Sequence, residues 1–350
     1  MPAVLVAAAA AAVATFAGLQ PQLASGGGAI YLTFAAGNVV SVARSTDAGA
    51  TFASPVALPE AGRLALGKRR GPRIAATAEA VVVAAIAGAR GGGADGDLVL
   101  YRSTDQGRTW TAPIVVNDVP GAAREGMHGL AANASGIVVL AWLDLRQKGT
   151  RIYAAVSRDH GATWSPDRLV YTSPSGSVCE CCHPSVAVAD DGRVAIMFRN
   201  HLEGRRDMYV VESRDGATLG TPFGAAIKQG RGSWLLEACP MDGGAVALGA
   251  GITNAVWRRE ATLYATETRA PSAVTDAEVE LGPGRDPVVA RHDQRVDMAW
   301  TGPDGIVVRQ AGGAPTTLGP GGFASIVAMP AQTLVAYEHQ GRVTVHVVRR

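Results

Sequence analysis

The sequence has 350 residues, a formal net charge of +2 and 47% hydrophobic residues, which is enough material for a large core. Only 18% of the residues are charged, and the charges form no basic tail or stripe, so nucleic-acid binding is not expected. The composition, with 43 glycines and four cysteines, also excludes a collagen, a coiled coil and a disulfide-dense miniprotein.

The N-terminal segment, residues 3–19, is apolar and uncharged and ends at Gln20 and Pro21. An apolar run followed by small residues is typical of a secretory signal. We therefore predict a signal peptide over residues 1–19, cleaved after Ala14 or Ala17, and an exported (periplasmic or secreted) mature protein. The alternative is that this segment forms a helix or strand of the mature fold. No later stretch reaches the 18 apolar residues of a membrane span, so we expect none.

An eight-residue pattern recurs in the first two thirds of the chain. Residues 45–52, 103–110 and 157–164 each read Ser-x-Asp-x-Gly-x-Thr followed by Phe or Trp, and residues 213–219 are a degenerate fourth copy. The repeated aspartates lie 54–58 residues apart. Aspartate accepts backbone N–H bonds across a turn and glycine adopts a positive φ, so each copy predicts a hairpin turn.

This pattern is the Asp-box, or BNR repeat, and the chain resembles the sialidase-like β-propeller superfamily. The resemblance implies that the boxes lie on outer hairpins, far from the channel mouth. It says little about activity, because Asp-boxes also occur in propellers that are not enzymes.

A second repeat sets the number of blades. Short segments of small and branched residues begin near Pro21, Pro72, His128, Pro184, Pro240, Pro287 and Ala324, and each is followed by a second apolar strand. This is the strand order of propeller blades. We predict one all-β domain over residues 20–350: a six- or seven-bladed propeller of four-stranded antiparallel blades, with seven favoured. Five recurring tryptophans are expected to pack between blades, at positions 110, 142, 164, 257 and 300.

The loops that lead into the innermost strands should converge at one end of the channel. These mouth loops carry a set of charged and sulfur-containing residues: Lys68, Arg69, Arg70, Arg73, Glu125, His128, Cys179, Glu180, Cys181, Cys182, His183, Glu237, Cys239, Met241, Arg285 and Asp286.

All four cysteines lie in two neighbouring mouth loops. Thiolate, imidazole and thioether ligands select Cu(I) or zinc over magnesium and calcium, and a methionine favours copper. We therefore predict a soft-metal site with copper as the favoured cofactor. Its ligands would be Cys179, Cys181, Cys182, His183, Cys239 and Met241. The alternative is structural disulfides, with Cys239 bridged to the other loop and Cys181 paired with Cys182.

A sialidase would need an arginine cluster, a tyrosine nucleophile with a glutamate, and an aspartate acid. The segment Gly71–Ala75 only faintly resembles the Arg-Ile-Pro segment of sialidases, and Tyr337 with Glu338 is a weak nucleophile candidate. No local motif connects these residues, so no catalytic residue is assigned and enzyme activity stays an open question.

Three functions remain. The first is an exported propeller, not a true sialidase, with a copper or thiol site at the channel mouth. The second is an exo-acting glycoside hydrolase of the exo-alpha-sialidase type, acting on acidic sugars. The third is a non-catalytic binding propeller with structural disulfides. In each case we expect a monomer whose partner is a small ligand, metal ion or glycan at the mouth.

Overall fold

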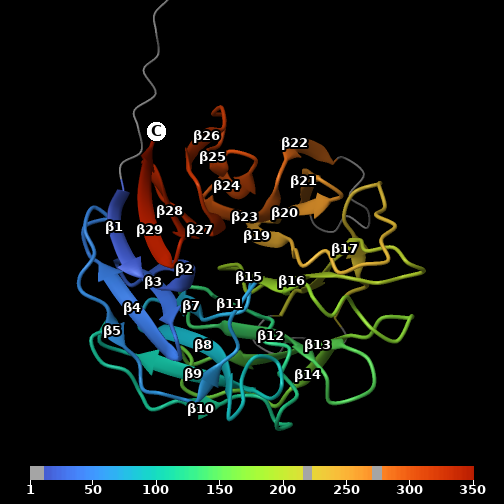
Figure 1. The fold of residues 1–350 in the computed structure, drawn as a ribbon, viewed down its shortest axis with the longest axis horizontal. Helices are drawn as coiled ribbons and strands as arrows, with labels where there is room; N and C mark the ends of the chain where they lie inside the picture. The colour runs from blue at the N-terminus through green and yellow to red at the C-terminus, as the bar shows by residue number, and fades with distance from the viewer. Residues whose placement is uncertain (1–11, 216–222, 270–277) are drawn as a thin grey trace, which may run out of the picture.

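The computed structural model describes residues 12–215, 223–269 and 278–350, and in these residues the regular secondary structure is entirely β. Seven antiparallel sheets stand around a central channel as the blades of a propeller (Figure 1). The prediction of an all-β propeller is confirmed, and of the two predicted ring sizes seven blades is correct.

Blades 1 to 3 occupy the first half of the chain, and each runs from the channel outward. Blade 1 contains β2 (Leu19–Gly26), β3 (Ala29–Ala36), β4 (Val39–Ser45) and β5 (Val56–Ala57). Blade 2 contains β7 (Arg73–Ala76), β8 (Val81–Gly88), β9 (Asp97–Ser103) and β10 (Ile114–Val115), with the short β6 (Arg63–Leu64) also paired to β8. Blade 3 contains β11 (His128–Ala132), β12 (Val138–Asp144), β13 (Arg151–Ser157) and β14 (Arg168–Tyr171).

Blades 4 to 6 repeat this order. Blade 4 contains β15 (Ser185–Val188), β16 (Val194–Arg199), β17 (Met208–Ser213) and β18 (Ile227–Lys228). Blade 5 contains β19 (Ala245–Gly249), β20 (Ile252–Arg259), β21 (Thr262–Arg269) and β22 (Val279–Pro283). Blade 6 contains β23 (Arg285–His292), β24 (Arg295–Gly302), β25 (Gly305–Arg309) and β26 (Thr316–Gly319).

Blade 7 closes the ring with strands from both ends of the chain. It contains β27 (Gly322–Ala328), β28 (Gln332–His339), β29 (Arg342–Arg349) and, as the outermost strand, β1 (Ala12–Ala17). Figure 1 shows β1 beside β29. Residues 12–17 therefore form a strand of the ring, which is the alternative considered for this segment, whereas residues 1–11 of the predicted signal peptide lie outside the described residues.

The core lies in the seams between blades. Strands such as β8 and β12 are buried along almost their whole length because both of their faces meet a neighbouring blade, so they read as continuous apolar runs. Each seam holds its own cluster of buried side chains. Four of the five predicted tryptophans, at positions 110, 142, 164 and 257, belong to or pack against these clusters, with Trp142 fully buried; Trp300 is buried as well.

The three intact Asp-boxes connect the third and fourth strands of blades 1, 2 and 3, as predicted. In the first box, Asp47 accepts bonds from the Thr51 backbone N–H at 2.9 Å and its hydroxyl at 2.6 Å, and Ser45 Oγ accepts the Gly49 N–H at 2.8 Å. The other two boxes repeat this geometry. A Cβ at Gly49 would lie 2.3 Å from Leu334 in blade 7, so the box glycine allows contact with the preceding blade.

Candidate functional site

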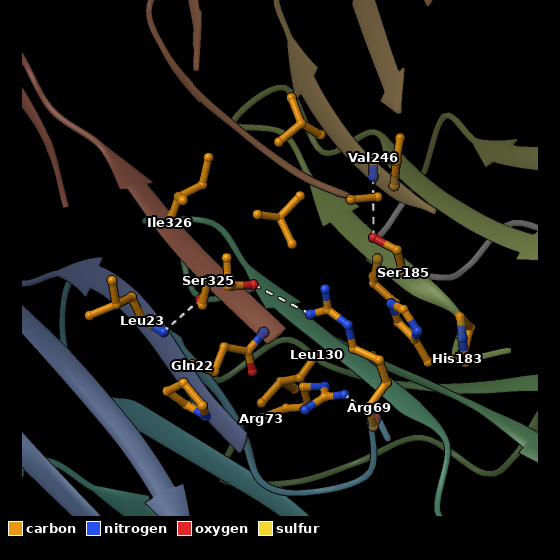
Figure 2. A pocket seen from close by; sticks show the side chains of 18 residues that line it. Gln22, Leu23, Arg69, Arg73, Leu130, His183, Ser185, Val246, Ser325 and Ile326 are labelled. Atoms are coloured by element: carbon orange, nitrogen blue, oxygen red, sulfur yellow. Dashed lines mark hydrogen bonds between the residues drawn. The ribbon is translucent and has the colours of Figure 1, made fainter. Parts of the chain in front are cut away.

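The central channel contains a polar cavity of about 170 Å³ at its mouth, bounded by the innermost strands and the mouth loops (Figure 2). Its polar lining consists mainly of Arg69, Arg73, His183, Gln22, Ser185 and Ser325. Farther along the channel the lining is mostly alanine and valine. The polar groups that could orient a ligand are therefore concentrated at the mouth, where the sequence predicted them.

Five residues that enter the innermost strands have left-handed backbone conformations without being glycine. They are Gln20, Arg69, Met241, Asp286 and Phe323, with φ between 50° and 57°. Such conformations are unfavourable for residues with a Cβ and persist only where the surrounding structure holds them. The mouth is thus a strained part of the fold, which is typical of a functional site.

Arg69 crosses the channel mouth from blade 2 to blade 6. Its Nε donates to Asp286 Oδ1 at 3.1 Å and its Nη2 to the Asp286 carbonyl oxygen at 2.7 Å, while Nη1 donates to the Ala324 carbonyl at 3.3 Å. Both side chains are almost fully buried. The charge of Arg69 is therefore satisfied within the protein.

Arg73 is different, because its guanidinium donates only to carbonyl oxygens, among them those of Arg69 and His128. Burial, and then the charge of Arg69, lowers its pKa to about 9. At neutral pH it remains a cation that lines the cavity and forms no ion pair within the described residues. It is the strongest candidate in the channel for contact with an anionic or polar ligand group.

Two buried histidines stand beside Arg73. His183 lines the cavity. His128 does not line it and is fully buried, with Nε2 3.3 Å from the Ala84 carbonyl. Among the described residues, no hydrogen-bond partner is found for the Nδ1 atom of either ring. Burial, followed by the neighbouring arginines, lowers the pKa of His128 to about 3 and that of His183 well below its usual value. Both imidazoles are therefore neutral, and Nδ1 of His183 is buried against Gly243.

Carboxyl groups gather on the blade 5 to blade 7 side of the mouth. Asp242 accepts the Asp286 N–H at 3.1 Å and lies 2.9 Å from Arg258 Nε. Burial, and then the charge of Asp286, raises the pKa of Asp242. Burial also raises the pKa of Glu338, which accepts the Gln20 N–H at 2.5 Å. The sequence analysis missed Asp242, although it directly follows the predicted ligand Met241.

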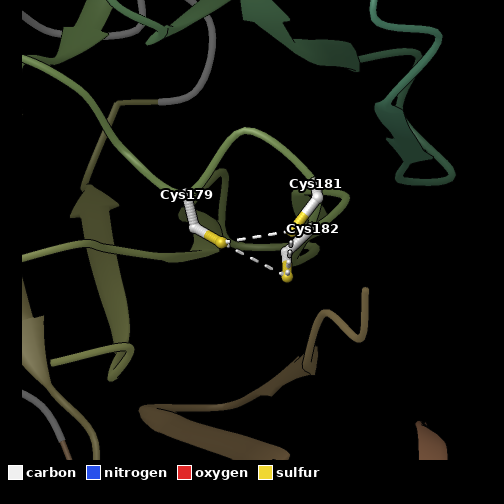
Figure 3. Close-up of side chains that lie close together, drawn as sticks. All are labelled: Cys179, Cys181 and Cys182. Carbon is white, nitrogen blue, oxygen red and sulfur yellow. Dashed lines mark hydrogen bonds between the residues drawn. The ribbon is translucent and has the colours of Figure 1, made fainter. Parts of the chain in front are cut away.

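Three of the four cysteines, Cys179, Cys181 and Cys182, form a compact cluster of potential metal ligands (Figure 3). Cys179 Sγ lies 3.6 Å from the sulfurs of both Cys181 and Cys182, which are 4.0 Å from each other. All three side chains are at least nine-tenths buried, and Met241 packs against them. Within the described residues this is the one group of three or more potential metal ligands with mutually close donor atoms. No disulfide joins any of the four cysteines in this structure, and all four lie in the described residues.

Hydrogen bonds and charge distinguish the three thiols. Sulfur–sulfur hydrogen bonds join Cys179 to Cys181 and to Cys182, and Cys179 also lies 3.3 Å from Arg206 Nη1; these contacts lower the pKa of Cys179. Donating its proton raises the pKa of Cys181, and burial raises that of Cys182. Cys179 is therefore the thiol that ionises first. The sequence analysis did not connect Arg206 with this cluster.

The structure brings together only part of the predicted ligand set. Cys179, Cys181, Cys182 and Met241 are in contact, whereas His183 turns toward the channel cavity. Cys239 is exposed and is not a member of the cluster. Tyr337 lies in the seam between blades 6 and 7, where its hydroxyl is 3.1 Å from His346 Nε2. Its position in the core argues against the nucleophile role considered for it.

Several solved structures share this fold at low sequence identity. An alpha-L-arabinofuranosidase of Fusarium graminearum, solved with arabinobiose, is 14% identical with a TM-score of 0.53, over 95% of this chain and 93% of its own. An ulvan lyase, a polysaccharide lyase solved with a sugar fragment, is 10% identical with a TM-score of 0.57, over 97% and 95%. The sialidase of Trypanosoma rangeli is 13% identical with a TM-score of 0.52, but only 55% of its length is covered.

These likenesses and the Asp-boxes define the class of the molecule, a sialidase-like β-propeller. The sequence profile of the BNR repeat-like domain family matches residues 73–248, which is half of the chain. The chain belongs to the BNR repeat-like domain family. No curated protein matches it significantly. Among the described residues, no helix is long and apolar enough to cross a membrane.

Proposed function

We propose that this propeller holds one soft metal ion, Cu(I), at Cys179, Cys181 and Cys182, and that it is not a true sialidase. The observation that carries the proposal is the sulfur triangle, with sides of 3.6, 3.6 and 4.0 Å. Sulfurs bound about 2.3 Å from one ion lie roughly 4 Å apart. Three thiols that lie this close already have nearly the spacing that a bound ion requires.

The donor set supports copper over harder metals. Thiolates favour Cu(I) and zinc, and the thioether of Met241, which packs against the three thiols, is a ligand that suits copper. Met241 is the proposed fourth, weaker ligand. His183 and Cys239, although included in the ligand set predicted from sequence, are not part of the group in contact.

Titration of the reduced protein with Cu(I), against a chromophoric Cu(I) chelator, tests the site. We expect one tightly bound Cu(I) per chain, and loss of this binding in Cys181→Ser and in Cys182→Ser. Cys239→Ser is the matched control and should bind like the wild type. Equal binding by all variants would contradict the proposal. A thiol titration of native protein that finds no free thiol would instead support the third function, a binding propeller with structural disulfides.

A second function, carbohydrate processing or binding at the channel mouth, is favoured by the buried cation Arg73 in the cavity. The similar arabinofuranosidase and sialidase structures hold a sugar or an inhibitor. We propose that a glycan or another small polar ligand enters the cavity beside Arg73 and His183. Exo-acting hydrolysis of acidic sugars is the enzymatic form of this proposal.

Fluorogenic sialosides and arabinosides, together with an ulvan lyase assay, separate binding from catalysis. We expect sialoside turnover far below the roughly 1–1000 per second of ordinary enzymes. A sialoside turned over within that range would make the glycosidase the primary function. Tyr337→Phe should leave any such activity unchanged, since its hydroxyl lies in the core. Export is a further proposal, tested by the N-terminal sequence of protein recovered from its native cell.

A further inference from the structure

Two arginines beside the cysteine cluster lack a carboxylate partner. Arg199 is 1% exposed, and its Nε and Nη2 donate to the backbone carbonyls of Asp242 and Arg258. Arg206 donates through Nε to the Leu236 carbonyl at 3.4 Å and places Nη1 3.3 Å from Cys179 Sγ. In the described parts of the chain, neither guanidinium forms an ion pair.

Three carboxylates of this region are paired with other cations. Asp242 lies 2.9 Å from Arg258, Asp207 lies 3.5 Å from Lys228, and Glu203 lies 2.7 Å from Arg205. A buried cation is costly unless an anion compensates it. The charge of Arg206, and that of Arg199, which also acts on the Asp242 carboxylate, can therefore act on an anion placed at the three sulfurs.

The fold fixes Arg206 in this position through non-local contacts. The hairpin after β16 pairs with the mouth loop of blade 5: the Arg206 N–H donates to the Trp234 carbonyl at 2.8 Å, and the Leu236 N–H donates to the Gly204 carbonyl at 3.0 Å. The centroid of the Trp234 ring lies 5.3 Å from the guanidinium carbon of Arg199 and 5.2 Å from that of Arg258. The positive groups are thus built into the wall of the cysteine cluster.

Charge then discriminates between soft metals. Three thiolates around Cu(I) carry a net charge of −2, which two guanidinium groups neutralise, whereas three thiolates around Zn²⁺ carry −1. The interaction of one guanidinium with a complex of charge −2 is twice that with a complex of charge −1. We infer that Arg199 and Arg206 make the cysteine cluster selective for a monovalent soft cation, with Arg206 as the specificity-determining residue. This inference rests on the metal site proposed above.

Substitution of Arg206 tests it, with the affinities for Cu(I) and Zn²⁺ each measured by chelator competition on the reduced full chain. Arg206→Gln should weaken Cu(I) binding about tenfold or more. The factor by which it weakens zinc binding should be smaller by about threefold or more. Arg206→Lys keeps the charge and should stay within about threefold of the wild type for Cu(I). Arg205→Gln removes an exposed neighbouring charge that pairs with Glu203, so both affinities should be unchanged.

The outcomes separate the two proposals. Equal losses for both metals in Arg206→Gln, or no loss for either, would overturn the selectivity while leaving the metal site in place. A wild type that binds neither metal would overturn both. If the glutamine variant does not fold, Arg206→Met is measured in its place: a larger loss for Cu(I) than for zinc supports the selectivity, and equal losses refute it.

Discussion

Arg69 and Asp286 lie 217 residues apart in sequence, on blades that are not neighbours in the ring, yet Arg69 Nε is 3.1 Å from Asp286 Oδ1. The Asp286 carbonyl accepts a second bond from the same guanidinium. The pair connects opposite parts of the ring at the channel mouth, and it holds Arg69 against the cavity where a ligand would enter.

Loss of this pair should destabilise the whole ring. Asp286→Asn removes the anion that compensates a buried guanidinium, and we expect the free energy of unfolding to fall by about 3 kcal/mol. Urea denaturation measures the change. The exposed pair of Glu203 and Arg205 is the control: Glu203→Gln should shift the same quantity by less than about 0.5 kcal/mol. Equal shifts in both variants would show that the ion pair across the mouth contributes no more to stability than an exposed ion pair.

The Asp-boxes should contribute to stability and not to activity. Asp105 accepts the backbone N–H and the hydroxyl of Thr109, at 2.9 and 2.7 Å, and binds Ser103 Oγ as well. Asp105→Ala leaves these donors without their acceptor, so we expect a loss of about 1–3 kcal/mol in urea denaturation. Asp304, an exposed aspartate in a turn of blade 6, is the comparison residue. Its alanine variant should be as stable as the wild type.

The same box predicts a pH dependence. The hydrogen bonds from Thr109 hold the pKa of Asp105 well below its usual range, which is about 3.9 in an unfolded chain. Above about pH 5 the carboxyl is ionised in both states and its contribution is complete. As the pH falls through 4 toward the lower pKa of the folded state, only the unfolded chain takes up the proton, so the contribution is lost.

Asp105→Asn isolates this effect because asparagine does not titrate. The stability difference between wild type and Asp105→Asn, from denaturation at a series of pH values, should be constant between pH 5 and 8 and shrink from about pH 4 downward. A difference that grows as the pH falls would contradict the assignment.

The fold could be predicted because its repeats are local. Each Asp-box fixes a hairpin through residues at most four positions apart, and predicted starts such as His128 and Ala324 lie in the innermost strands β11 and β27. The innermost strand of blade 5 was predicted to start near Pro240, but β19 begins only at Ala245. The intervening residues belong to a long mouth loop that pairs with the hairpin after β16, and such pairing leaves no periodic signal in the sequence.

The site was predictable only to the level of the loop. Cys179, Cys181 and Cys182 converge because one short turn carries them, which their spacing already indicated. The approach of Arg206 to Cys179 depends on contacts between two separate loops, as does the packing of Met241 on the sulfurs. The outward position of Cys239 has the same origin, because a residue two positions from the half-buried Met241 can face solvent in an irregular loop.

The N-terminal strand gives the last prediction. β1 pairs with β29 along Ala12–Ala17 and completes the four strands of blade 7. Phe16 stacks on Phe34 of blade 1, with ring centroids 5.4 Å apart, so the strand also joins blade 7 to blade 1. Removal of residues 1–17 would expose β29 as an edge and uncover part of that seam.

We therefore expect a chain that begins at Gly18 to unfold at clearly lower urea concentration than the full chain, or to aggregate. A chain that begins at Ala12 keeps all of β1 and is the control, and it should match the full chain. Phe16→Ala in the full chain isolates the aromatic contact, with an expected loss of about 2–4 kcal/mol, since this ring is only partly buried. If the chain that begins at Gly18 is as stable as the full chain, β1 is dispensable, and cleavage after Ala14 or Ala17 would be compatible with the folded ring.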